Sequence, residues 1–139
     1  MRLFLLSALL FIVGLGVSVS SVAQDSSLVQ WKVSSKKISS SKYELQFTGK
    51  IKSGKFLYLF SKDAEGLDSI IVNFTDSAIV KDGSMQVNTG AKSFTDPTFE
   101  NKSIVIADDE VKLVQQIKIN GTVPAKLKGT IVFATGAKE

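Results

Sequence analysis

The chain has 139 residues and a formal net charge of +4, contains neither cysteine nor histidine, and has a single arginine, Arg2. This composition excludes disulfides, thiolate chemistry, imidazole metal ligands, Ser-His-Asp or Cys-His catalysis, and arginine capture of phosphate beyond position 2. The positive charge comes from scattered lysines without interleaved aromatic residues, so we expect a solvated surface and no nucleic-acid binding. We also expect no cofactor and no metal.

The amino-terminal residues have the pattern of a secretory signal peptide. One positive charge precedes the apolar residues 3–17, and Ser21 and Ala23 supply small side chains at the −3 and −1 positions. An uncleaved anchor is the alternative, but the apolar run is shorter than the about 20 residues of a bilayer span. We therefore predict a signal peptide over 1–23 and a mature domain over 24–139, periplasmic or secreted, with no membrane span after cleavage.

The clearest strand pattern lies in the middle of the chain. Residues 43–51 alternate between apolar and polar side chains, which predicts a strand with one face on a core. Residues 56–60 are apolar throughout, which predicts a central strand covered on both faces. Ser53-Gly54 between them predicts a turn, so we expect the two strands to form a hairpin.

Two weaker patterns precede this hairpin. Residues 28–33 predict a short strand that carries the single tryptophan, Trp31. A lone tryptophan beside valines is more typical of a core than of a ligand-stacking platform. Residues 34–42 are almost entirely serine and lysine and predict an exposed turn.

Alternation and turn signals continue after the hairpin. Residues 70–74 predict a further strand, and Asp82-Gly83 predicts a two-residue type I′ hairpin between residues 78–81 and 84–87. Residues 88–97 have the composition of a loop.

The last third of the chain predicts three more strands, at residues 103–106, 110–119 and 127–134. Asp108-Asp109 predicts a turn, and Asn120-Gly121 is a second signal for a primed hairpin turn. About eight short strands without helical periodicity indicate an all-β fold, an antiparallel β-sandwich of the immunoglobulin-like type. The predicted shared core contains Leu45, Phe47, Val72 and Phe133.

Acidic residues offer two weak suggestions of a site. Asp63, Glu65 and Asp68 could supply oxygen ligands for Ca²⁺. Their spacing does not match the EF-hand loop, so a solvated loop is the favoured interpretation. Paired acids of a glycosidase could come from Asp96 and Glu100, or from residues 108–110. No sequence feature places either pair in a pocket.

Three stretches together carry a resemblance to a known family. They are Tyr43-Glu44-Leu45-Gln46-Phe47 running into Ile51, Gly54 and Phe56-Leu57-Tyr58; Phe94-Thr95-Asp96-Pro97-Thr98-Phe99 followed by residues 111–119; and residues 127–133, Leu-Lys-Gly-Thr-Ile-Val-Phe. In this order they resemble the amino-terminal periplasmic domain of the thiol:disulfide interchange protein DsbD, including the related domains of Bacteroidetes-type bacteria. The resemblance covers nearly all of the mature chain.

The resemblance implies a redox site that this sequence lacks. In that family the last of these strands runs into a cysteine pair that passes electrons to periplasmic partners. The corresponding place here is Ala134-Thr135-Gly136, so no catalytic residue carries over and thiol–disulfide exchange is excluded.

The resemblance also points to a surface for partner binding. Tyr58, Phe94 and Phe99 match an aromatic neighbourhood that shields the cysteines in the family, and Pro97 lies in the same loop. Two interpretations stay open. These residues are either ordinary core and loop-anchoring aromatics, or an apolar surface kept for a partner.

We therefore expect an exported, non-catalytic module that binds a protein or a glycan. The alternative is an accessory protein of a periplasmic thiol–disulfide or cytochrome c biogenesis pathway, which binds envelope thiol-oxidoreductases without exchanging electrons. A carboxylate-based hydrolase is the less favoured third possibility. The sequence leaves the oligomeric state open.

Overall fold

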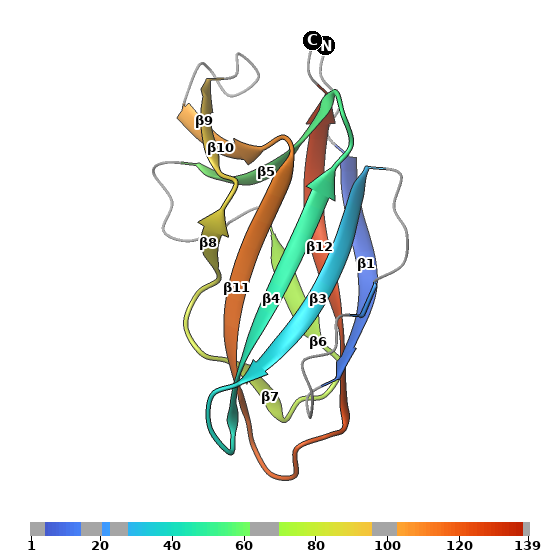
Figure 1. Cartoon of the computed structure of the whole chain (residues 1–139), viewed down its shortest axis with the longest axis vertical. Coiled ribbons are helices and arrows are strands. Elements are labelled where there is room, and N and C mark those ends of the chain that lie inside the picture. The colour runs from blue at the N-terminus through green and yellow to red at the C-terminus, as the bar shows by residue number, and fades with distance from the viewer. Residues whose placement is uncertain (1–4, 15–20, 23–27, 62–69, 96–102, 138–139) are drawn as a thin grey trace.

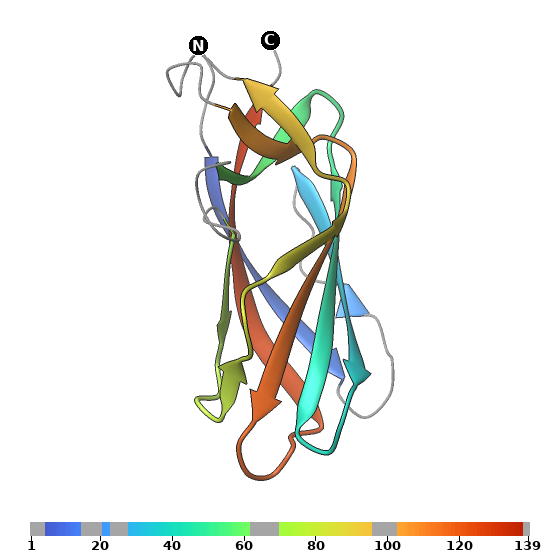
Figure 2. The same ribbon diagram turned by 90° about the vertical axis from the view of Figure 1, so that its left-hand side faces the viewer.

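A computed structural model describes residues 5–14, 21–22, 28–61, 70–95 and 103–137. Within these ranges the chain forms twelve strands and no helix, arranged as two antiparallel sheets that face each other (Figure 2). The described residues include no helix that is long and apolar enough to cross a membrane. The antiparallel β-sandwich is thereby confirmed, and its immunoglobulin-like character stays a prediction.

One sheet, here called sheet A, contains the strands from both ends of the chain. Its order is β1 (Leu5–Gly14), β12 (Lys126–Ala137), β5 (Lys55–Ser61), β10 (Ser103–Ala107) and β9 (Lys92–Thr95). The short strand β6 (Ile71–Phe74) pairs with β12 beside β5. Since β12 also pairs with β1 along its other edge, it is the central strand of this half of the sheet.

The other sheet, sheet B, lies in front in Figure 1. Its order is β2 (Ser21–Val22), β3 (Val29–Lys37), β4 (Lys42–Ile51) and β11 (Glu110–Ile119), with β7 (Ile79–Lys81) and β8 (Gln86–Thr89) both on the far side of β11. The long strands β3, β4 and β11 pair over almost their whole length.

Most of the apolar side chains form one core between the sheets. The four predicted core residues, Leu45, Phe47, Val72 and Phe133, all belong to it, which confirms that prediction. Trp31 is also a core residue, with 1% of its surface exposed and its ring 5.6 Å from that of Phe133.

Strand β5 is buried on both faces, as its sequence predicts. Leu57 and Leu59 face the core between the sheets, and Phe56 and Tyr58 belong to a second apolar cluster. Because side chains alternate along a strand, the second cluster lies on the outer face of sheet A.

Aromatic rings lie over glycines at three places where two strands pair. In each pair the two residues are direct partners in the ladder, and a Cβ on the glycine would come within 2.6 to 2.8 Å of the ring. The ring therefore fills the space that the glycine leaves and fixes the register of the strands. The pairs are Trp31 with Gly49, Phe56 with Gly136, and Phe11 with Gly129.

The predicted hairpin around Ser53-Gly54 is wrong, although the turn itself is present. Gly54 has a φ of 83°, and the Lys55 N–H donates to the Lys52 carbonyl at 3.0 Å. The turn leads from β4 in sheet B to β5 in sheet A. The primed hairpin at Asn120-Gly121 is wrong for the same reason, because it lies between strands of different sheets. In both cases the two strands pack their apolar faces against each other across the sandwich instead of pairing edge to edge.

The predicted hairpin at Asp82-Gly83 is also wrong. Strands β7 and β8 do not pair with each other but follow one another along the same edge of β11. The link between them is held to β11, since the Asp82 N–H donates to the Gln116 carbonyl at 2.9 Å and Gln115 Nε2 donates to the Gly83 carbonyl at 3.0 Å. Gln115 is thus a buried polar residue with a structural partner.

Two segments expected to be irregular contain strands. Strand β3 continues to Lys37, so the turn that follows it is shorter than residues 34–42, and β9 lies within the region expected to be a loop. Residues 5–14, within the predicted signal peptide, form β1. Signal cleavage stays a prediction, and cleavage after Ala23 would remove both β1 and β2.

Candidate functional site

The outer face of sheet A carries an apolar cluster at the end of the sandwich where β5, β9 and β10 meet (Figure 1). We call it the outer aromatic cluster. The ring of Phe56 lies at its centre, 4.9 Å from the ring of Tyr58 and 5.5 Å from the ring of Phe94. Its members are Phe56, Tyr58, Ile104, Ile106 and Ala134, with the half-buried Phe94 packed against them.

The structure brings two of the four predicted binding residues together in this cluster. Phe94 is half-buried on β9, and Tyr58 is buried with 3% of its surface exposed. A residue as buried as Tyr58 positions its neighbours and offers little surface of its own. Pro97 and Phe99 lie outside the described residues.

Of the two predicted acid pairs, the structure describes only residues 108–110. Asp108 is held by Lys92, whose Nζ lies 2.9 Å from Oδ1 and 3.1 Å from Oδ2. The adjacent Asp109 and Glu110 are exposed. The other candidates, Asp63, Glu65, Asp68, Asp96 and Glu100, lie outside the described ranges.

A cavity of about 150 Å³ lies beside β6 and the start of β12. It is lined by Thr75, Asp76, Ile79, Pro124, Lys126, Leu127 and Lys128. Its one carboxylate is engaged locally, because Asp76 Oδ1 accepts the Ala78 N–H at 2.9 Å. The cavity therefore offers no facing acids, and the described part of the chain contains no group of three or more acidic, histidine or cysteine side chains that could hold a metal.

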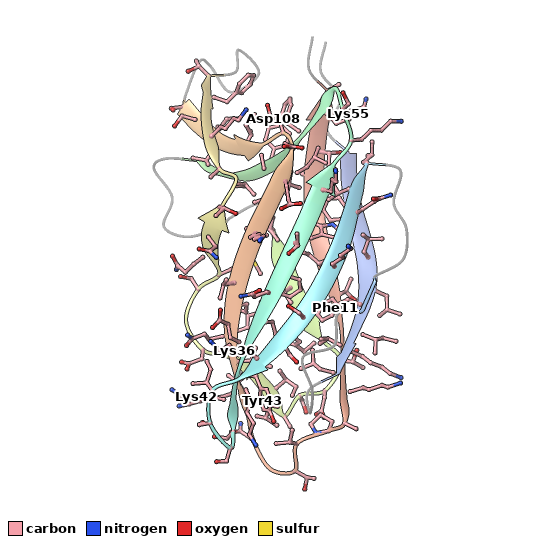
Figure 3. All side chains as sticks on the ribbon, viewed as in Figure 1. Phe11, Lys36, Lys42, Tyr43, Lys55 and Asp108 are labelled. Atoms are coloured by element: carbon pink, nitrogen blue, oxygen red, sulfur yellow. The ribbon has the colours of Figure 1, made fainter. Side chains whose placement is uncertain are left out.

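The outer face of sheet B is polar and rich in lysine. Lys32, Lys36, Lys50 and Lys112 are exposed there on neighbouring strands, and Glu44 and Glu110 lie among them. Figure 3 shows Lys36 and Lys42 at one end of this face, where Lys42 Nζ pairs with Asp82 Oδ2 at 3.2 Å. This arrangement is that of a solvated sheet face without aromatic platforms.

Sequence reasoning missed a second feature, the edge of β12 that pairs with β1. The two strands are partnered from Leu5–Thr135 to Gly14–Lys126. Leu9, Phe11 and Val13 point into the core, and Phe11 lies edge-on to Phe47 at 5.4 Å and to Phe74 at 6.3 Å. The strand therefore completes the core at this edge of the sandwich.

Comparison with known protein families, with curated proteins and with solved structures finds no match for this chain.

Proposed function

We propose that this chain is an exported, non-catalytic interaction module whose partner is a protein. Its composition supports this, because a chain without cysteine and histidine has no thiolate nucleophile and no imidazole to act as a general base near neutral pH. Among the described acids no two face each other in the cavity, which gives no support to a carboxylate-based hydrolase.

The observation that carries this proposal is the outer aromatic cluster. The outer face of an antiparallel sandwich is ordinarily polar, as it is on sheet B. At one end of sheet A it is instead apolar and aromatic. The five central members of this cluster are buried, so its accessible part is the half-buried Phe94 at its margin, and an aromatic side chain at such a place is typical of an interface anchor. Pro97 and Phe99, which follow Phe94 in the sequence, stay part of the proposal from the sequence alone.

The Phe94→Ala variant tests this surface. Loss of an aromatic anchor would weaken binding by about 2 kcal/mol while the fold is kept. The exposed neighbour Ser93 supplies the matched control, Ser93→Ala. Thermal unfolding and quantitative capture of proteins from an envelope extract are measured on both variants and on Phe99→Ala.

A large fall in the thermal midpoint with unchanged capture would make Phe94 a structural residue and remove the main support for the surface. A fall in capture at an unchanged midpoint is the result that we expect. Ser93→Ala changes neither quantity.

Export rests on the pattern of residues 1–23. Intact-mass measurement of protein recovered from the periplasm or the medium tests it directly. A mass that begins at Gln24 is expected, whereas a mass that retains residues 3–17 would contradict cleavage after Ala23.

A role beside a thiol–disulfide or cytochrome c biogenesis pathway is the second candidate, and the sequence resemblance favours it. Such an accessory would bind envelope thiol-oxidoreductases through the same surface without exchanging electrons. Enrichment of proteins with paired active-site cysteines by the wild type, and its loss in Phe94→Ala, would separate this role from that of a general binding module.

A further inference from the structure

The edge of β12 is a seat for one more strand, and residues 5–14 occupy it. Their ten backbone positions run antiparallel to residues 126–135 without a break in register. The side chains of Leu9, Phe11 and Val13 are buried beneath the strand, with exposed fractions of 7%, 1% and 0%. At alternate positions of a strand that binds here, the core therefore requires an apolar side chain.

The seat is shaped for an aromatic side chain at one position. Gly129 is the direct partner of Phe11, and a Cβ there would lie 2.6 Å from Phe11 Cζ. Phe47 and Phe74 present their rings edge-on to the same side chain. Figure 3 shows Phe11 at the margin of the sandwich where β1 faces β3. The same device, a ring over a glycine, fixes β3 to β4 and β12 to β5, so the seat matches the rest of the fold.

The opposite face of β1 does not suit a surface strand. Leu10 is 54% exposed and Ile12 is 36% exposed, on the outer face of an edge strand. Surface positions of antiparallel edge strands are ordinarily polar or charged, which keeps the edge from associating with other chains. Residues 5–14 thus fit the edge of β12 on their inward face only. This is the pattern of a strand that another strand can replace.

We propose that in the processed protein this seat accepts an extended strand from a partner protein by β-augmentation. The strand would lie antiparallel to β12, with apolar residues at the positions of Leu9 and Val13, an aromatic residue opposite Gly129, and polar residues between them. Removal of β1 would leave the backbone of β12 unpaired along this edge and would uncover the apolar side chains beneath it. The inference rests on the proposed function in one respect, cleavage after Ala23.

A second copy of this chain does not fit the seat. Between strands, the segments that lie outside the described ranges are short, the longest being residues 62–69, and none has ten residues with alternating apolar side chains. The β12 strand of another copy could pair along the edge. Its inward side chains Leu127, Ile131 and Phe133 lie in its own core, however, and would not fill the positions of the buried side chains of β1. The occupant is therefore a strand of a different protein.

Strand exchange in the full chain tests the seat without assuming that residues 24–139 fold alone. A specific protease site is inserted after Ala23, the refolded chain is cut, and a fluorescent peptide of residues 3–14 with a lysine tag is added in excess. Incorporation is followed by anisotropy. Unlabelled competitors are the wild-type peptide, Phe11→Ala, Leu10→Ala, and a Leu10→Thr, Ile12→Thr double variant that keeps only the inward face.

The labelled peptide is expected to enter the cut protein and to be displaced by the wild-type competitor. The Phe11→Ala competitor should be weaker by about 100-fold or more, since it loses a fully buried aromatic side chain. Leu10→Ala and the double threonine variant should compete within about threefold of the wild type, because their changes lie on the exposed face.

Three results would overturn the proposal. They are failure of the labelled peptide to enter after the cut fragment has dissociated, equal competition by Phe11→Ala, and formation of a dimer by the cut chain that excludes the peptide. An exported protein whose mass still includes residues 1–23 would instead contradict the cleavage step of the proposed function. The exchange assay thus tests the strand-binding edge, and the mass measurement tests signal cleavage, so each can contradict its own proposal without the other.

Discussion

Replacing Phe11 with alanine asks whether residues 5–14 belong to the folded domain. Phe11 has 1% of its surface exposed and lies edge-on to Phe47 and Phe74. Gly129 beneath its ring has no side chain that could fill the gap. Removing a buried phenylalanine side chain at such a site costs about 3–5 kcal/mol of unfolding free energy. In a domain of this size that corresponds to a fall of roughly 10–15 °C in the thermal midpoint.

The measurement is denaturant unfolding of the full, uncleaved chain. Trp31 is the only tryptophan and is buried against Phe133, so its fluorescence reports the core directly. Leu10→Ala is the matched control on the same strand, because Leu10 is 54% exposed, and it should change the unfolding free energy by about 0.5 kcal/mol or less. Equal unfolding curves for Phe11→Ala and Leu10→Ala would refute the reasoning and place residues 5–14 outside the cooperative unit.

Three further predictions concern the core and the chemistry. Gly49→Ala should lower the unfolding free energy by about 1–3 kcal/mol, because its Cβ would lie 2.8 Å from Trp31 Cζ3. In a double-mutant cycle, Gly49→Ala should cost less unfolding free energy in the Trp31→Leu background, where the larger ring is absent. Gln115→Ala should cost about 1–3 kcal/mol, since its buried amide donates to the carbonyls of Gly83 and Gln116, whereas Gln116→Ala on the exposed face should leave the denaturation midpoint unchanged. An insulin-reduction assay with a thiol donor should give no rate above the donor alone, because the chain has no sulfur nucleophile, and activity that copurifies with the protein would contradict this.

The candidate site was only partly accessible to prediction. The resemblance directed attention to Tyr58 and Phe94, and the structure places both in one cluster around Phe56. It could not tell which of them is accessible, because exposure depends on β10 and β9, which lie beside β5 in sheet A and are distant from it in sequence. The seat on β12 was missed altogether, since nothing local distinguishes Gly129 from any other strand glycine.

Alternation along a single strand is a local property, and for this reason the sequence by itself determined several features of the protein. Period-two patterns predicted β4, β6 and β11 and the shared core, and the continuous apolar run predicted that β5 would be covered on both faces. The absence of thiol and imidazole chemistry is likewise a matter of composition alone.

Only the tertiary structure decided which strands pair. Asp82-Gly83 and Asn120-Gly121 allow a tight turn, but the identity of the neighbouring strand depends on which apolar faces meet across the sandwich, and those contacts are distant in sequence. Residues 5–14 show this most clearly. A continuous apolar run is compatible with both a signal peptide and a buried strand. It becomes β1 only because the edge of β12, more than 100 residues away, presents Gly129 and unpaired backbone groups at the matching register.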